Sequence, residues 1–133
     1  MVTEIQKMAP TVAFAALSQD SRAVLIDVRD PVEFSFVGHP IGAVNIPLKF
    51  APGMSTNPDF LSQVRATVPD VMTPIFLLCR SGQRSMAAAE VLYEAGFQSL
   101  TNIEEGFEGG MDDAKHRSTV NGWRFHGLPW QQS

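Results

Sequence analysis

The sequence contains a single cysteine among its 133 residues, which excludes an intrachain disulfide and a zinc cage built from thiolates. Its three histidines, His39, His116 and His126, lie far apart and lack metal-binding spacing, so neither a metal nor another cofactor is expected. No apolar run approaches the roughly 18 residues that a membrane-spanning helix needs, and the amino-terminal residues lack the continuous apolar stretch of a secretory signal. We therefore expect a soluble, cytoplasmic protein.

An excess of positive charge is also missing. The chain has 10 lysine and arginine residues against 14 aspartate and glutamate residues, a formal net charge of −4. Proteins that bind nucleic acids or anionic membranes usually carry clustered positive charge, so neither is expected as a partner, and a monomer is the default. Hydrophobic residues make up 44% of the chain, which is enough for a core, and the length fits one domain over residues 1–133.

Apolar runs typical of buried strands alternate with segments typical of helices. Strands are expected over residues 3–8, 23–28, 43–46, 75–78 and 97–103, and helices over residues 10–17, 30–37, 58–68 and 85–95. Residues 49–57 are expected to form a loop, and residues 106–110 a flexible segment. This alternation predicts an α/β fold with a mostly parallel central sheet covered by helices on both faces.

Particular residues mark where helices begin and end. Asp30 can cap the second helix, Pro31 suits its first position, and Glu33 completes a capping-box pattern. Gly38 ends this helix, and Gly96 ends the helix over residues 85–95. Residues 110–133 form an atypical C-terminal extension that is expected to fold back onto the core through Trp123, Phe125, Leu128 and Trp130.

The most informative segment is Cys-Arg-Ser-Gly-Gln-Arg-Ser at residues 79–85. It lies between the most apolar strand and an alanine-rich helix, so its backbone N–H groups should converge at the carboxyl end of the strand, where open α/β sheets bind ligands. The helix N-terminus and its dipole form an anion site there, which would stabilise a Cys79 thiolate. Gly82 permits backbone conformations that other residues resist. The remaining side chains, Arg80, Ser81, Gln83, Arg84 and Ser85, supply positive charge and polar groups.

Cys79 has two interpretations. A free cysteine at the end of a strand is commonly a small buried hydrophobic residue. An inert thiol, however, has no need of two arginines, two serines and a glycine in the next six positions, because those residues require solvent or an anion. The reactive interpretation is therefore favoured.

Spacing distinguishes two kinds of chemistry for a cysteine in an anion site. Cysteine phosphatases use the pattern C-x5-R, whereas Cys79 and Arg84 form the pattern C-x4-R. The smaller ring of amides suits a terminal sulfur anion better than a tetrahedral phosphate. Transfer of sulfane sulfur is therefore favoured over an arsenate reductase or phosphatase-like activity, which remains an alternative.

Two separated stretches resemble the single-domain rhodaneses, a sulfurtransferase family. The first, over residues 24–47, contains Leu-Ile-Asp-Val-Arg, Gly-His and Gly-Ala-Val-Asn-Ile-Pro, and the second is the segment over residues 79–85. With Gly106 and residues 127–129, the likeness spans almost the whole chain. The chain departs from the family pattern in having Pro40-Ile41 for the usual Ile-Pro, Gly106-Phe107 for a glycine pair, and a more distant tryptophan, Trp123.

The resemblance implies a rhodanese-like three-layer domain and a sulfurtransferase with Cys79 as its catalytic nucleophile. The Cys79 thiolate would attack the outer sulfur of a small anionic donor such as thiosulfate, and cyanide or a thiol would then remove the sulfur from the persulfide. Arg80 and Arg84 are the candidates for binding the donor's oxygens, with loop bracing as the alternative role of Arg84. The other substrate-binding candidates are Ser81, Gly82, Gln83 and Ser85.

Residues outside this loop have expected supporting roles. Asp27 and Arg29 are candidates for supporting the active-site loop, with Asp27 accepting hydrogen bonds from it. The alternative for both is a local ion pair or a helix cap. A structural role is favoured for His39, hydrogen-bonded within its turn, over a role as general base. Trp123 and Trp130 are expected to pack in the core or at its edge.

A third hypothesis belongs to a different functional class. The protein would be a sulfur-carrier or regulatory module loaded by a protein persulfide donor, with slow turnover of thiosulfate. The polar residues 111–122 would be the place for such a partner to bind, although a solvated surface loop is the favoured interpretation of this stretch.

Overall fold

The computed structural model describes residues 5–133, and the part of the expected first strand at residues 3–4 lies outside them. The helices are α1 (Pro10–Gln19), the π-helical η1 (Glu33–Val37), α2 (Phe60–Thr67) and α3 (Gln83–Glu94). The strands are β1 (Gln6–Met8), β2 (Val24–Asp27), β3 (His39–Pro40), β4 (Val44–Asn45), β5 (Lys49–Phe50), β6 (Ser55–Thr56), β7 (Ile75–Leu78), β8 (Leu100–Ile103) and β9 (Trp130–Gln131).

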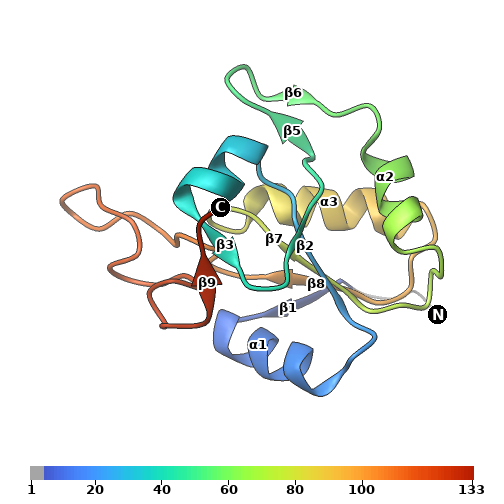
Figure 1. The fold of residues 1–133 in the computed structure, drawn as a ribbon, viewed down its shortest axis with the longest axis horizontal. Helices are drawn as coiled ribbons and strands as arrows, with labels where there is room; N and C mark the ends of the chain where they lie inside the picture. The colour runs from blue at the N-terminus through green and yellow to red at the C-terminus, as the bar shows by residue number, and fades with distance from the viewer. Residues whose placement is uncertain (1–4) are drawn as a thin grey trace.

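The central sheet has five strands in the order β1-β8-β7-β2-β4, and every neighbouring pair is parallel. Helix α1 covers one face, and α2 and α3 lie over the other (Figure 1). Two small antiparallel pairs, β3 with β9 and β5 with β6, lie outside this sheet. The predicted three-layer α/β architecture is confirmed.

The strand β7 lies at the centre of the sheet and is buried along its whole length. Because successive side chains point to opposite faces, Ile75 and Leu77 pack with α2 and α3, whereas Phe76 and Leu78 pack on the side of α1. Each such side chain contributes roughly 1.5–3 kcal/mol on burial. This packing fixes the carboxyl end of β7, from which Cys79 follows.

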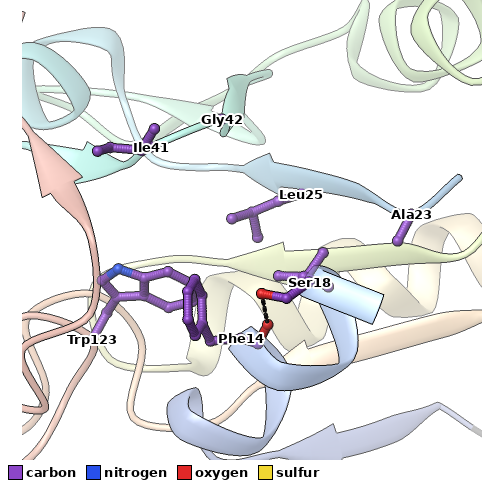
Figure 2. A pocket seen from close by; sticks show the side chains of 8 residues that line it. Phe14, Ser18, Ala23, Leu25, Ile41, Gly42 and Trp123 are labelled. Atoms are coloured by element: carbon purple, nitrogen blue, oxygen red, sulfur yellow. Dashed lines mark hydrogen bonds between the residues drawn. The ribbon is translucent and has the colours of Figure 1, made fainter. Parts of the chain in front are cut away.

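The C-terminal residues supply part of the core beneath the sheet. Trp123 is 1% exposed and meets the ring of Phe14 in α1 edge-on, at 5.8 Å between centroids. Its Nε1–H donates to the carbonyl of Pro129 at 2.9 Å. Figure 2 shows these two rings beside Leu25 and Ile41, around a cavity of about 220 Å³. Trp130, in contrast, is partly exposed and lies at the edge in β9.

Three expectations about local structure need correction. Residues 49–57, expected as a loop, contain the hairpin β5–β6, whose two-residue strands are too short to show a period in the sequence. Helix α3 begins at Gln83, two residues earlier than expected, because Gly82 adopts a left-handed conformation before it. Residues 106–110, expected to be flexible, are held where Phe107 donates to the carbonyl of Cys79 and Glu108 to that of Arg80.

The other expected helices and strands are found within a few residues of their predicted bounds. Within residues 5–133, no helix has the length and apolar character to cross a membrane.

Candidate active site

Cys79 directly follows β7 at the carboxyl edge of the sheet, and its side chain is almost completely buried. Its Sγ accepts the backbone N–H of Gly82 at 3.1 Å and lies 3.3 Å from Oγ of Ser85. The 12-residue helix α3 begins immediately after Gly82. The helix dipole therefore places partial positive charge beside the sulfur, in the expected strand–loop–helix arrangement.

Gly82 makes this arrangement possible through its backbone. Its φ of 111° lies in the left-handed region, which a residue with a Cβ rarely adopts. A Cβ at this position would meet no atom closer than 3.6 Å, so the requirement for glycine is conformational. This conformation turns the Gly82 N–H back toward the sulfur.

A small cavity of about 50 Å³ lies at Cys79. Its lining residues are Cys79, Arg80, Ser81, Gln83 and Arg84. Of the predicted site residues, Ser85 is buried and contacts the sulfur, while Gly82 donates to it. Every residue of the segment therefore lines this cavity or contacts the Cys79 sulfur.

A second and larger cavity, of about 440 Å³, shares Arg80 and Arg84 with the first. Its other lining residues are Glu33, Ala51 and Met54. The small cavity at Cys79, called the sulfur cradle below, therefore adjoins a cleft bordered by η1 and the hairpin β5–β6. Sequence reasoning missed this cleft, because it treated residues 49–57 as a loop without a place in the fold.

Arg84 and Glu33 form a bidentate ion pair, with Nη1–Oε1 at 2.8 Å and Nη2–Oε2 at 3.0 Å. Burial by itself raises the pKa of Glu33, but the hydrogen bonds and charge of Arg84, together with the Asp30 N–H and the charge of Arg29, outweigh burial and lower it. The hydrogen bond to Glu33 likewise raises the pKa of Arg84. Glu33 also accepts the backbone N–H of Asp30, as its predicted capping role requires. This geometry favours the bracing role of Arg84.

The environment of the Arg80 side chain differs from that of Arg84. Its side chain is exposed, and within residues 5–133 it makes no hydrogen bond or ion pair. Glu33 neutralises Arg84, so Arg80 supplies the uncompensated positive charge at the mouth of the cradle.

Replacing Glu33 by Gln is expected to lower the free energy of unfolding by about 1 kcal/mol at pH 7, because the partly buried ion pair is lost. The folded state lowers the pKa of Glu33, so this stabilisation is present above the ordinary carboxyl range and disappears as the pH falls through the folded-state value. Urea unfolding of both proteins should therefore converge once the pH falls below the ordinary carboxyl range. The control is Glu90→Gln, an exposed carboxylate on α3 with no ion pair among the described residues; an equal loss there would contradict the assignment.

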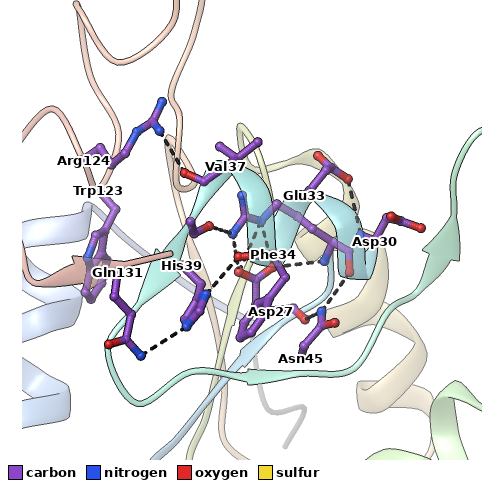
Figure 3. Close-up of polar contacts among 12 residues, drawn as sticks. Asp27, Asp30, Glu33, Phe34, Val37, His39, Asn45, Trp123, Arg124 and Gln131 are labelled. Atoms are coloured by element: carbon purple, nitrogen blue, oxygen red, sulfur yellow. Dashed lines mark hydrogen bonds and ion pairs between the residues drawn. The ribbon is translucent and has the colours of Figure 1, made fainter. Parts of the chain in front are cut away.

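Asp27 and Arg29 form a buried ion pair rather than direct supports of the loop (Figure 3). The Asp27 carboxylate accepts Nε–H and Nη2–H of Arg29 at 2.9 and 2.6 Å, and also its backbone N–H. In the described chain it accepts nothing from residues 79–85, so that predicted role is wrong and the local ion pair is correct. The physical reason is proximity, because the guanidinium of Arg29 occupies both carboxylate oxygens of Asp27.

Arg29 supports the site indirectly. It donates to the carbonyl of Gly38 at 2.6 Å, and its guanidinium lies 4.6 Å from the ring centre of Phe107. Its Nη1 has no hydrogen-bond partner among the described residues. Because the N–H of Phe107 donates to the carbonyl of Cys79, the cation–π contact connects the ion pair to the base of the loop.

His39 has a structural position, as predicted. Its Nδ1 donates to the carbonyl of Phe34 at 2.9 Å, and its ring is stacked on that of Phe34 at 3.7 Å (Figure 3). The imidazole is buried and pairs through its backbone with Gln131 of β9. It is not among the residues that line the two cavities beside Cys79.

Two residues outside the loop also contact it: sequence reasoning missed Asn102, whereas Gly106 is part of the family resemblance. Asn102 in β8 accepts a hydrogen bond from Ser85 at 2.5 Å and donates one to the carbonyl of Gly82 at 3.1 Å. The sequence does contain a signal for Asn102, which is an amide side chain inside an apolar strand, because a buried polar side chain needs hydrogen-bond partners. Gly106 packs so closely on the loop that a Cβ would lie 2.5 Å from the Arg80 carbonyl.

Groups of three or more metal-ligating side chains are absent from residues 5–133. Residues 111–122 form a largely exposed loop that projects from the rest of the chain (Figure 1).

Comparisons with known proteins agree with this geometry. The model of the rhodanese-like domain family matches residues 11–113. An uncharacterized protein of Rickettsia prowazekii, RP600, is 34% identical over 96% of this chain and 98% of its own length. Thiosulfate sulfurtransferase 16, a chloroplastic protein of Arabidopsis thaliana, is 39% identical over 78% of this chain and 76% of its own. The crystal structure of Rv0390 from M. tuberculosis has a TM-score of 0.89 and 39% identity, and the likeness covers 98% of this chain and all of that one. On these grounds the chain belongs to the rhodanese-like domain family.

Proposed function

We propose that this protein is a sulfurtransferase that carries sulfane sulfur as a persulfide on Cys79. Membership of the rhodanese-like family and the relationship to a thiosulfate sulfurtransferase support a transferase of this type. The observation that carries the proposal is the position of the Cys79 sulfur, which faces the N-terminus of α3 at the edge of a small cavity and accepts the Gly82 N–H.

The reaction consists of two displacements at sulfur. The Cys79 thiolate attacks the outer sulfur of thiosulfate, an S–S bond forms, and the S–S bond of the donor breaks to release sulfite with its electron pair. Cyanide or a thiolate then attacks the outer sulfur of the persulfide and regenerates the thiolate. Charge is conserved in both steps, and the enzyme alternates between two forms, so ping-pong kinetics are expected.

The size of the cradle supports sulfur as the transferred atom. The cavity at Cys79 is small, with a volume of about 50 Å³, which suits a small transferred group. A persulfide adds one atom beyond Sγ, and that atom carries a negative charge. Free N–H groups at the start of α3 stabilise such a charge.

A phosphatase or arsenate reductase activity is the weaker alternative. Phosphatases of the C-x5-R type bind the oxyanion with the arginine at the end of the loop, but both terminal nitrogens of Arg84, the arginine in the corresponding place, are bound to Glu33. We expect no turnover of an aryl phosphate. Hydrolysis that depends on Cys79 would favour this alternative.

The test of the proposed function is the intact mass of the protein after incubation with thiosulfate. We expect a gain of one sulfur atom that cyanide removes and that is absent when Cys79 is replaced by Ser. No adduct in a folded protein would contradict thiosulfate as the donor.

The larger cavity favours the variant of the proposal in which the protein is a sulfur carrier loaded by a protein donor. A volume of about 440 Å³ beside the cradle exceeds the needs of thiosulfate or cyanide and admits a larger thiol or the persulfide of a protein donor. Loading by a cysteine desulfurase that is much faster than loading by thiosulfate would identify a sulfur carrier. Equal or slower loading would favour the small-molecule enzyme.

Arg80 is expected to bind the oxygens of an anionic donor. Arg80→Gln should raise the KM for thiosulfate about tenfold, since one charge-assisted hydrogen bond is lost, and should leave the melting temperature unchanged because the side chain is exposed. Steady-state kinetics at constant ionic strength measure the effect. Arg22→Gln, at a distant exposed turn, controls for net charge; an unchanged KM in Arg80→Gln would remove Arg80 from donor binding.

A further inference from the structure

Two buried polar side chains, Ser85 and Asn102, form a chain of contacts that begins at the Cys79 sulfur. Ser85 Oγ is 3.3 Å from Sγ and 2.5 Å from Oδ1 of Asn102. The amide nitrogen of Asn102 is 3.1 Å from the carbonyl of Gly82. Cys79, Ser85 and Asn102 are each 5% exposed or less, so these groups must satisfy one another.

The donors and acceptors in this chain of contacts have only one consistent direction. The Gly82 carbonyl can only accept, so Nδ2 of Asn102 faces it and Oδ1 faces Ser85. Oδ1 carries no hydrogen, so the single hydroxyl hydrogen of Ser85 is donated to Asn102 at 2.5 Å. Ser85 therefore has only lone pairs to offer to Cys79.

This hydrogen-bond direction is compatible with a Cys79 thiol or persulfide and unfavourable for a Cys79 thiolate. A thiol can donate its S–H to the lone pairs of Ser85. A thiolate has no hydrogen to place between its own lone pairs and those of Ser85. The Ser85 hydroxyl could rotate and donate to the thiolate, but Oδ1 of Asn102 would then be buried without a donor, which carries a free-energy cost. In a persulfide the negative charge lies on the outer sulfur, so Sγ needs no donor from Ser85.

We propose that Asn102 is a positioning residue that fixes Ser85 as a hydrogen-bond acceptor toward Cys79, and thereby disfavours the empty thiolate relative to the thiol and the persulfide. The inference rests on the proposed function for the role of Cys79. It assigns Ser85 the opposite hydrogen-bonding role from that of a donor to the thiolate. It also gives the chain a device for retaining sulfur once it is loaded.

The charged groups around Cys79 stay constant while Ser85 and Asn102 are changed. Arg84 acts on the sulfur from α3, and Glu33 on η1 neutralises it. The others near the site are Arg80 on the loop, Asp27 and Arg29 at the end of β2, and Glu104 and Glu105, whose backbone lies against Gly82 after β8. None of these side chains is hydrogen-bonded to Ser85 or Asn102 in the described chain, so changes to that pair leave these charges in place.

The experiment is a pH titration of the far-ultraviolet absorbance of the Cys79 thiolate. Because the chain has one cysteine, subtracting the signal of Cys79→Ser leaves Cys79 alone, and no sulfur donor is needed. Ser85→Ala, Asn102→Leu and the double variant are compared with the parent protein. Thr101→Val is the matched control, because Thr101 is the buried neighbour of Asn102 in β8 and points to the opposite face of the sheet.

We expect Ser85→Ala to move the titration midpoint to lower pH by about half a unit, because the thiol loses its acceptor. Asn102→Leu should move it down by about one unit, because the freed hydroxyl can then donate to the thiolate. In the Asn102→Leu background, Ser85→Ala should raise the midpoint. A residue with a merely structural role would not reverse the sign of the Ser85→Ala effect.

A shift of the titration midpoint in the opposite direction overturns the inference. If Ser85→Ala raises the midpoint in the parent protein, the hydroxyl already donates to the sulfur; if the sign is the same in both backgrounds, Asn102 does not direct it. Should Asn102→Leu fail to fold, the sign in the parent protein decides alone. The expected shifts in a protein that gains sulfur from no donor would refute the proposed function and leave this hydrogen-bond assignment intact.

Discussion

Replacing Cys79 by Ser is expected to lower the rate of thiocyanate formation from thiosulfate and cyanide by at least about a thousandfold, because the nucleophile that forms the covalent intermediate is removed. A serine oxygen cannot take over the persulfide. The chain has no other cysteine, so no neighbouring thiol can substitute. Steady-state assays under saturating thiosulfate measure the loss.

The fold should tolerate this change. Ser is close in size to Cys, and its hydroxyl can use the Gly82 N–H and the Ser85 oxygen that surround Sγ, so the melting temperature should remain within a few degrees. Cys79→Ala provides a second inactive variant without the hydroxyl. Turnover that survives in both folded variants would exclude a Cys79 persulfide from the mechanism.

Replacing Asp27 by Asn is expected to lower the free energy of unfolding by about 3–5 kcal/mol, because a buried guanidinium loses its ion-pair partner. Arg29 is completely buried and its Nη2 is 2.6 Å from the Asp27 carboxylate. Such a loss is a large fraction of the 5–15 kcal/mol typical of a whole domain. Urea unfolding at pH 7 measures it.

Two further variants separate the ion pair from a general effect of removing a carboxylate. Asp20→Asn breaks an exposed pair with Arg22 at 3.5 Å and should cost less than about 1 kcal/mol. The double variant Asp27→Leu with Arg29→Met should recover much of the lost stability, because no buried charge remains uncompensated. Equal costs for Asp27→Asn and Asp20→Asn would contradict the account of this pair.

The consequence for activity tests the indirect support that Arg29 gives the loop. The guanidinium rests on Phe107, whose N–H holds the Cys79 carbonyl. The stable double variant should therefore retain the fold and show a lowered rate of persulfide formation. This result would separate the contribution of the pair to stability from its contribution to the position of Cys79.

The amino-acid sequence by itself determined the features that depend on neighbouring residues. The four apolar residues of β7 match their predicted bounds, because a short apolar run before a glycine-containing loop is a local signal for a buried strand. The capping contacts of Asp30 and Glu33 join residues two and three positions apart. The segment from Cys79 to Ser85 is likewise local, so its gathering around one sulfur was predictable.

Only the tertiary structure decided the roles of side chains whose partners are distant in the chain. Glu33 and Arg84 are 51 positions apart, and no pattern in either segment indicates that the cap residue of one helix neutralises the arginine of another. Asn102 meets Ser85 only because β8 lies beside β7 in the sheet. Asp27 accepts from Arg29 instead of the loop because the folded backbone brings the guanidinium within reach first. A sequence limits which groups can bond, but which of several competent partners is nearest depends on how the elements pack.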